Sequence, residues 1–190
     1  MAEEIIGLLR RSPTKARARL NGFIRAFNVR FPPQDAEERG SAEALTWALM
    51  DGPLTLYAIG LNGPAIVELH SIVERLALRE TARHLAVPKR RSLLMKILRR
   101  YTLPDLTALL CEVGVLDKED LKLAKKLNAL RNGIAHKNER LVSNLLASGR
   151  RISYLDIDRQ IAKLDCIPLI TQSTKFLTKM AKITVKVSIS

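Results

Sequence analysis

Arg131, Asn132 and His136 are the residues best suited to chemistry in this chain, and they lie within one short segment, LAKKLNALRNGIAHKN, residues 123–138. A histidine with an ordinary pKa of about 6.5 can accept and donate a proton near neutral pH. A guanidinium stays charged and can hold two phosphoryl oxygens at once, and an amide can orient the histidine or donate to phosphate. Because the 2′-hydroxyl of RNA can attack the adjacent phosphorus, these groups suit RNA cleavage without a metal. His136 would then be the acid and base, and Arg131 would stabilise the phosphate charge.

The apolar pattern predicts that this segment is an amphipathic helix that opens at an Asp117 N-cap. Its stripe consists of aliphatic residues at helical spacing: Leu123, Leu127, Leu130 and Ile134. At about 100° per residue, Asn132 and His136 lie about 40° apart on the helix, whereas Arg131 and His136 lie about 140° apart. Either the helix loosens after Gly133, because glycine weakens helical preference, or a second subunit completes the pair.

The same residue types elsewhere have a simpler interpretation. Arg79 and His84 are separated as Arg131 and His136 are, but they lie inside a long predicted helix and are interpreted as surface charge. His70 lies beside the apolar face of that helix and is interpreted as a structural histidine. For His136 the structural alternative is a helix C-terminus, where a basic side chain interacts favourably with the helix dipole. The separation alone therefore does not identify a site.

The composition favours helices packed through aliphatic side chains, since 47% of the residues are hydrophobic but only 4% are aromatic. We expect an all-α fold, an up-and-down bundle of four to five helices. The sequence predicts helices at residues 42–50, 64–86, 89–101 and 102–115, then from 117 on, and a last one from about 155 to 181 that Pro168 breaks or kinks. The alternating ITVKVSIS, residues 183–190, predicts a short C-terminal strand or tail.

The predicted organisation has three parts: a basic N-terminal helical extension and linker at 1–40, the bundle at 41–182 and the tail at 183–190. Pro13 is expected to break the extension, and the proline- and charge-rich FPPQDAEERGS, residues 31–41, is expected to be a linker. Turns are predicted at residues 51–53 and 62–64, the second with Asn62 or Gly63 as the N-cap of the helix that follows.

The chain carries a formal charge of +13 and has an isoelectric point near 10.2, which attracts nucleic acid, an anionic membrane or an acidic partner. Its densest basic stretch is KRRSLLMKILRRY, residues 89–101, which contains no acid. Four apolar residues there are expected to pack inward: Leu93, Leu94, Ile97 and Leu98. RNA phosphate contacts are predicted for five basic residues, although a solvated helix face would explain them too: Lys89, Arg90, Arg91, Lys126 and Lys137.

Several classes of site have no sequence support. Cys111 and Cys166 are far apart, lack C-x-x-C spacing and are interpreted as reduced, buried thiols. The chain has no metal-ligand spacing, no glycine-rich phosphate loop and no paired carboxylates at metal spacing, so we expect no metal and no cofactor. Without a secretory leader or an apolar run of about 18 residues, we expect a cytoplasmic protein with no transmembrane segment.

LRNGIAHKN, residues 130–138, resembles the signature of the HEPN (higher eukaryote and prokaryote nucleotide-binding) family. That signature is an arginine, a polar residue directly after it and a histidine a few residues on, with an apolar lead-in and a small residue before the histidine. Arg131, Asn132 and His136 match it. The resemblance is specific over about a dozen residues, and over residues 64–138 it extends only to a pattern of helices.

The resemblance implies a helical bundle that is usually a homodimer, in which two motif copies face each other and form a metal-independent ribonuclease site. It also implies a toxin or defence component with a cognate antitoxin. A second interpretation is a catalytically silent, dimeric HEPN-like module that binds RNA or protein. A third is a basic helical adaptor that binds a membrane or an acidic partner through residues 1–30.

Overall fold

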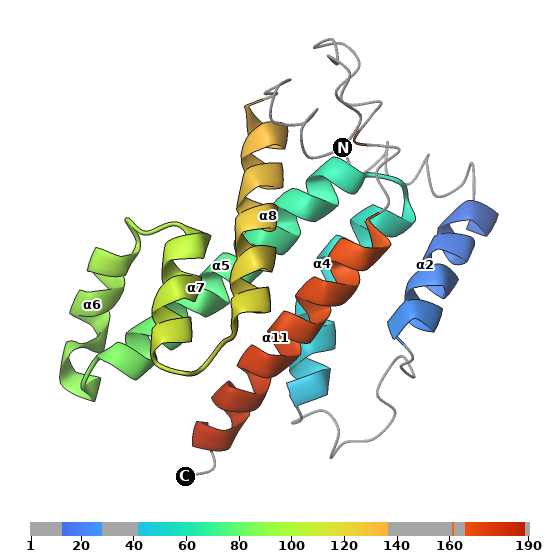
Figure 1. Ribbon diagram of the computed structural model, residues 1–190. Coiled ribbons are helices and arrows are strands. Elements are labelled where there is room, and N and C mark those ends of the chain that lie inside the picture. Colours follow the sequence, from blue (N-terminus) through green and yellow to red (C-terminus); the bar gives the residue numbers. More distant parts are fainter. Residues whose placement is uncertain (1–12, 28–41, 137–160, 162–165, 189–190) are drawn as a thin grey trace.

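The helices pack around α5 (Asn62–Leu85), which contacts most of the others (Figure 1). The computed structural model describes residues 13–27, 42–136, 161 and 166–188, and every regular element there is helical. The other elements are α2 (Pro13–Phe27), α4 (Ala42–Ala58), the 3-10 turn η1 (Pro88–Arg90), α6 (Arg91–Leu98), α7 (Leu103–Glu112), α8 (Lys118–Ala135) and α11 (Ile167–Ser188). The predicted all-α bundle is therefore confirmed.

The core is built from aliphatic side chains, as the composition indicates. Leu69 of α5, Leu110 of α7, Leu127 of α8 and Leu177 of α11 are fully buried in one continuous cluster. These helices lie side by side because each has an apolar stripe that must be covered by its neighbours.

Helix α2 belongs to this core, although the sequence places it in an extension. It packs against α4 and α11. Phe23 is 1% exposed and meets Trp47 of α4 edge to face, with ring centroids 6.0 Å apart. The Arg19 guanidinium donates to the Tyr57 carbonyl at 2.8 Å and lies over the Tyr57 ring. The N-terminal helix is thus tied to α4 by both apolar and polar contacts.

The predicted turn at residues 51–53 is wrong, because α4 continues through it with Pro53 inside the helix. Trp47, Met50, Leu54 and Tyr57 are all buried and recur every three or four residues. Burial of this apolar face outweighs the local turn preference of Asp-Gly-Pro, which is a weaker effect.

Helix α5 begins two residues earlier than predicted, and its N-cap is Leu61. The turn before it uses Gly60, whose φ of +91° lies in the left-handed region. Asn62 is therefore not the cap. Its side chain accepts from Arg19 at 3.2 Å and donates to the Ile161 carbonyl at 3.3 Å.

The prediction that four apolar residues of segment 89–101 pack inward is wrong for two of them. Leu98 is 3% exposed and Leu94 is partly buried against the core. Leu93 and Ile97, however, are 59% and 50% exposed. Leu85, the last residue of α5, is also exposed. The cause is that α6 lies at the edge of the bundle and packs mainly on α5 (Figure 1).

The predicted C-terminal strand is wrong, because residues 183–188 continue α11. The predicted interruption near Pro168 agrees with the described residues, because Ile161 is helical, Cys166 is not, and α11 begins at Ile167. Pro168 is the second residue of α11, where a proline costs little because the first-turn N–H groups have no partner within the helix.

Several predictions concern residues outside the described ranges: the linker at 31–41, Lys137 and the beginning of the last predicted helix at about 155. Among the helices that the structure describes, none combines the length and the apolar character needed to cross a bilayer.

Candidate active site

The beginning of α8 is fixed by an N-terminal capping box, as the sequence predicts for Asp117. The Asp117 carboxylate accepts from the backbone N–H groups of Glu119 and Asp120 at 2.9 and 3.0 Å. The Asp120 carboxylate in turn accepts from the Asp117 N–H at 3.1 Å. Each bond satisfies a helix-end group that has no partner within the helix.

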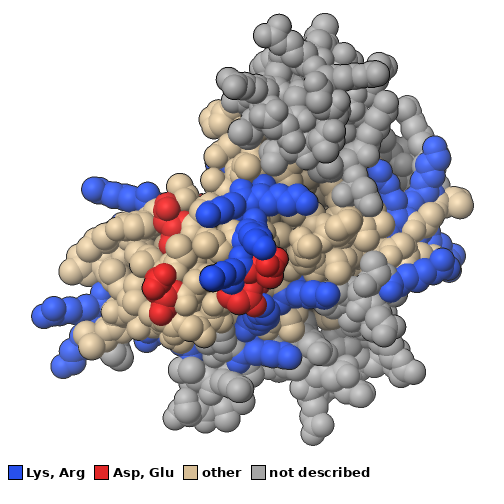
Figure 2. Space-filling model, viewed as in Figure 1, with Lys and Arg blue, Asp and Glu red and all other residues tan. Residues whose placement is uncertain are grey.

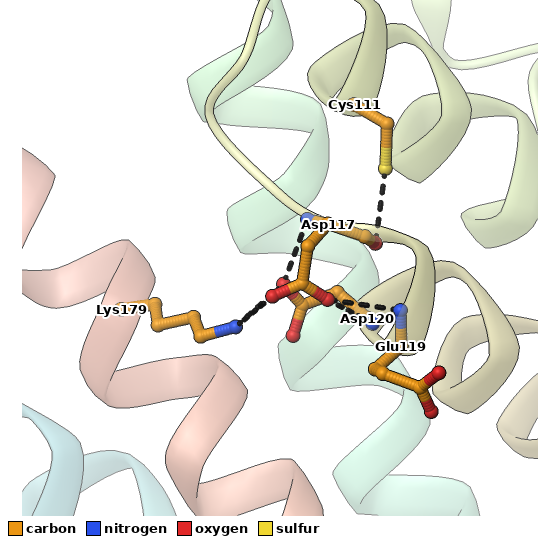
Figure 3. A network of polar contacts seen from close by, with 5 residues as sticks. All are labelled: Cys111, Asp117, Glu119, Asp120 and Lys179. Atoms are coloured by element: carbon orange, nitrogen blue, oxygen red, sulfur yellow. Dashed lines mark hydrogen bonds and ion pairs between the residues drawn. The ribbon is translucent and has the colours of Figure 1, made fainter.

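Lys179 joins this cap to α11 (Figure 3). Its ammonium donates to Asp117 at 2.7 Å and to Asp120 at 2.9 Å. The hydrogen bond from Lys179, together with the backbone bonds, lowers the pKa of Asp117 to about 2. Burial opposes the charge on Lys179, but the two carboxylates outweigh it and raise the lysine's pKa. The contact joins the beginning of α8 to α11.

The predicted apolar stripe of α8 is present and faces the core, where α8 packs on α7 and α5. Leu123, Leu127 and Leu130 are buried, and Ile134 is partly buried. Ile134 lies beside Gly63, where an added Cβ would stand 3.7 Å from the isoleucine Cγ2. The end of α8 therefore lies beside the beginning of α5, and the two helices run antiparallel.

Arg131 and Asn132 lie next to each other at this end, where both side chains are half-buried. The Arg131 Nη1 donates to the Asn132 Oδ1 at 3.0 Å. Among the described residues Arg131 has no carboxylate partner, so its charge remains available to an anion. The amide thus holds the guanidinium through its neutral oxygen.

His136 is exposed and forms the C-cap of α8. Its backbone N–H still donates to the Asn132 carbonyl at 3.0 Å, and Gly133 lies inside the helix and is buried. The helix therefore does not loosen between Gly133 and His136. The Arg131 and His136 side chains are not turned to one side. Within one chain, α8 directs Arg131 and His136 to different sides, by about 140° for ideal geometry.

His70 of α5 is a neighbour of Arg131 that the sequence does not link to it. The ring is 3% exposed, and its Nε2 lies 3.3 Å from the Asn128 Oδ1. Burial is the main cause of a lowered pKa for His70, and the positive charge of Arg131 acts in the same direction, while Glu74 and Asn128 oppose it. His70 is thus a buried histidine held neutral beside the motif, which agrees with its predicted structural role.

A groove of about 370 Å³ lies between α8 and α11. It is lined by four lysines, three other polar residues and one leucine: Lys122, Lys126, Lys175, Lys179, Glu119, Asp120, Gln172 and Leu123. Lys122 pairs with Glu119 at 2.6 Å and Lys179 pairs with the cap, but Lys126 and Lys175 have no ion-pair partner among the described residues. Figure 2 shows this face, with basic side chains around a small acidic cluster.

The five residues predicted to contact RNA do not form one surface. Lys126 is exposed on α8, whereas Lys89, Arg90 and Arg91 follow the far end of α5. Since α5 has 24 residues and is about 36 Å long, that cluster lies at the opposite end of the helix from His136. Lys137 lies outside the described residues.

Two features depend on how the helices pack, so the sequence alone does not show them. Asn128 precedes Arg131 by three residues, so the sequence places both on one side of the helix. No local sequence pattern, however, shows the antiparallel packing of α5 and α8 that brings His70 to them. Lys175 and Gln172 reach the groove because α11, which packs mainly on α4, α5 and α2, also lies beside α8. In the described part of the chain, no group of three His, Cys, Asp or Glu residues is arranged to hold a metal ion.

Comparison with models of known protein families, with curated proteins and with solved structures finds no match to this chain.

Proposed function

We propose that this protein is a metal-independent endoribonuclease of the HEPN type, in which Arg131, Asn132 and His136 act on the RNA backbone. The observation that carries the proposal is the hydrogen-bonded Arg131–Asn132 pair, which no described carboxylate contacts, four residues before the exposed His136 at the end of α8. His136 would take the proton from the 2′-hydroxyl as that oxygen attacks the phosphorus, and would return it to the leaving 5′-oxygen as the P–O5′ bond breaks. Arg131 would stabilise charge on the phosphoryl oxygens.

The proposed site is completed by a second copy of the chain. The helix stays regular up to His136, so Arg131 and His136 of one chain point to different sides. If two α8 ends meet about a two-fold axis, Arg131 of one copy faces His136 of the other. A homodimer through this face is therefore part of the proposal.

The proposed RNA path runs from the groove between α8 and α11 to the motif at the end of α8, since Lys126 precedes His136 by ten residues, or about 15 Å of helix. Lys126 and Lys175 have no ion-pair partner in the described part of the chain and lie on the two helices that form the groove. Unpaired lysines bind phosphates without reading sequence. The cluster Lys89–Arg91 would contact only an RNA long enough to reach the far end of α5. A cognate antitoxin and a cytoplasmic location remain predictions that rest on the sequence.

Cleavage of single-stranded RNA in EDTA tests the proposal. We expect the wild-type protein to cut, and Arg131→Ala or His136→Ala to lower the rate at least about 100-fold with RNA binding retained. The products should carry 2′,3′-cyclic phosphate ends, because the attacking oxygen belongs to the RNA. Asn132→Ala should reduce the rate less, since the guanidinium loses only its support.

The chain supplies a matched control. Arg79 and His84 are both exposed on α5 and have the same separation, so Arg79→Ala and His84→Ala should leave cleavage unchanged. A preparation that binds RNA tightly but never cuts it, over several pH values and substrates, would instead indicate the silent binding module.

A further inference from the structure

One end of the bundle carries an uncovered apolar surface. Among the described residues, all the large hydrophobic side chains that are exposed fall between residues 85 and 113: Leu85, Val87, Leu93, Ile97, Tyr101 and Val113. Three of them, Leu93, Ile97 and Tyr101, recur every four residues. We call these three the α6 stripe.

Leu93 and Ile97 lie on one side of α6, because residues four apart differ by only about 40° on a helix. Tyr101 follows in the turn after α6, where the Arg100 N–H donates to the Ile97 carbonyl and the Tyr101 N–H to the Leu98 carbonyl. The core side of α6, with Leu94 and Leu98, lies about 100° away from the stripe, so packing on α5 cannot cover both.

The stripe is surrounded by unpaired cations. Six basic residues of η1, α6 and the turn after it are exposed: Lys89, Arg90, Arg91, Lys96, Arg99 and Arg100. None of the six forms an ion pair with a described residue, and no acid occurs between Pro88 and Pro104. Elsewhere, Lys122, Lys179 and Arg83 are paired with carboxylates.

We propose that the α6 stripe and its surrounding cations dock this protein on an anionic lipid surface. Leu93, Ile97 and Tyr101 would enter the boundary between headgroups and acyl chains, while the basic side chains would contact the acidic headgroups. Tyrosine suits this depth because its ring is apolar and its hydroxyl is polar.

The charges and the position of α6 favour a lipid surface over a second copy of the chain or an RNA as the partner. Two copies of the face brought together would oppose two sets of six cations, which repel. RNA would satisfy the cations but would leave Leu93 and Ile97 without an apolar partner. The surface also lies at the far end of α5 from His136, so docking there leaves the proposed active site open. This inference does not depend on the proposed function.

Vesicle co-sedimentation of the full chain tests the inference. We expect binding to phosphatidylcholine vesicles with about 30% phosphatidylserine and none to pure phosphatidylcholine. Leu93→Ser with Ile97→Ser should weaken binding about tenfold, because about half of each side chain is available for burial in lipid. Both residues are at the surface, so the variant should fold, which its thermal unfolding checks.

The contribution of the basic side chains to vesicle binding has a charge-matched control. Lys89→Ala, Arg90→Ala and Arg91→Ala together should weaken vesicle binding at least about tenfold. The same loss of three charges on α2, where Lys15, Arg17 and Arg25 are exposed, should weaken it much less. Equal weakening by both triple variants would mean that net charge alone drives binding, and it would overturn the inference.

A direct reporter of insertion is Ile97→Trp, because Trp47 is buried and gives a constant background. Its fluorescence should shift to shorter wavelength with anionic vesicles and be quenched by brominated lipid. Absence of vesicle binding by the wild type overturns the inference. So does a stripe variant that changes RNA binding or self-association but not vesicle binding, since RNA or a second copy would then be the occupant.

Discussion

At the scale of residues, the motif was predictable but its surroundings were not. The residue types of Arg131, Asn132 and His136 are read directly from the sequence, as is the Asp117 cap, because both depend on neighbours within a few positions. The contact between His70 and Asn128 depends on how α5 and α8 align. That alignment follows from packing over the whole bundle, so no local pattern contains it.

The first prediction concerns His70, whose pKa in the folded protein is lowered mainly by burial. In the unfolded chain the histidine takes up its proton near its ordinary pKa of about 6.5. Folding stability should therefore be constant above that pH and fall as the pH drops below it, because only the unfolded state gains the proton. Urea unfolding between pH 7.5 and 5.5 measures this loss.

His70→Gln should flatten that pH dependence. It should also lower stability by about 1 kcal/mol at pH 7.5, because the packing and the contact to Asn128 are altered. His84→Gln is the control, since His84 is exposed on the same helix. A His70→Gln protein that keeps the wild-type slope would show that another group produces it.

The second prediction concerns the cap of α8. Asp117→Ala should reduce the free energy of unfolding by about 1 kcal/mol, because two backbone N–H groups lose their acceptor. Glu119→Ala should change it by less than about 0.5 kcal/mol, since the Glu119–Lys122 pair is exposed. Urea unfolding compares the two variants.

The contribution of the Asp117 cap to folding stability should decrease at acid pH. The pKa of Asp117 is about 2 in the folded protein, against an ordinary value of 3.8. Its contribution should therefore be complete above pH 3.8 and decline as the pH falls toward 2. Equal acid sensitivity in wild type and Asp117→Ala would contradict this assignment.

At the scale of elements, helices with a full apolar stripe were predictable, while boundaries set by tertiary burial were not. The extent of α8 and the capped start of α7 at Thr102 agree with local signals. Asp51-Gly52-Pro53 and the alternation from Ile183 on are also local signals, yet both segments are helical. In α4 the buried face spans the break, so packing decides the conformation of residues whose local preference is opposed to it.

The third prediction follows from the proline inside α4. Pro53→Ala should stabilise the protein by about 1–3 kcal/mol, because a proline in a helix interior removes a backbone donor and crowds the preceding turn. Thermal or urea unfolding measures the gain. Gly52→Ala should stabilise less, since its Cβ would displace the Glu68 carboxylate that lies against Gly52. Loss of stability in Pro53→Ala would mean that the ring itself is a packing element.

At the scale of the whole molecule, the net charge of +13 is divided among surfaces with different neighbours. The groove beside α8 combines ion-paired lysines with lysines that no described carboxylate pairs. The far end of α5 combines cations that form no ion pair with a described residue with exposed aliphatic side chains. The sequence indicates an affinity for polyanions. It does not show that the charge is divided between two surfaces, because that division depends on how the helices pack. Two surfaces allow two anionic partners at once.

The central claim is that two copies of the chain share one RNA-cleaving site, and a mixed dimer tests it most directly. Arg131→Ala and His136→Ala chains are co-expressed with different tags, and the dimer that carries both tags is isolated. In such a dimer one site has lost both residues, while the other keeps Arg131 from one chain and His136 from its partner. The measurement is cleavage of single-stranded RNA in EDTA by this mixed dimer, beside the wild type and the two parent variants. Recovery of about half the wild-type activity, with both parents inactive, is the predicted result; a mixed dimer as inactive as its parents, with an active wild type, would contradict a shared site.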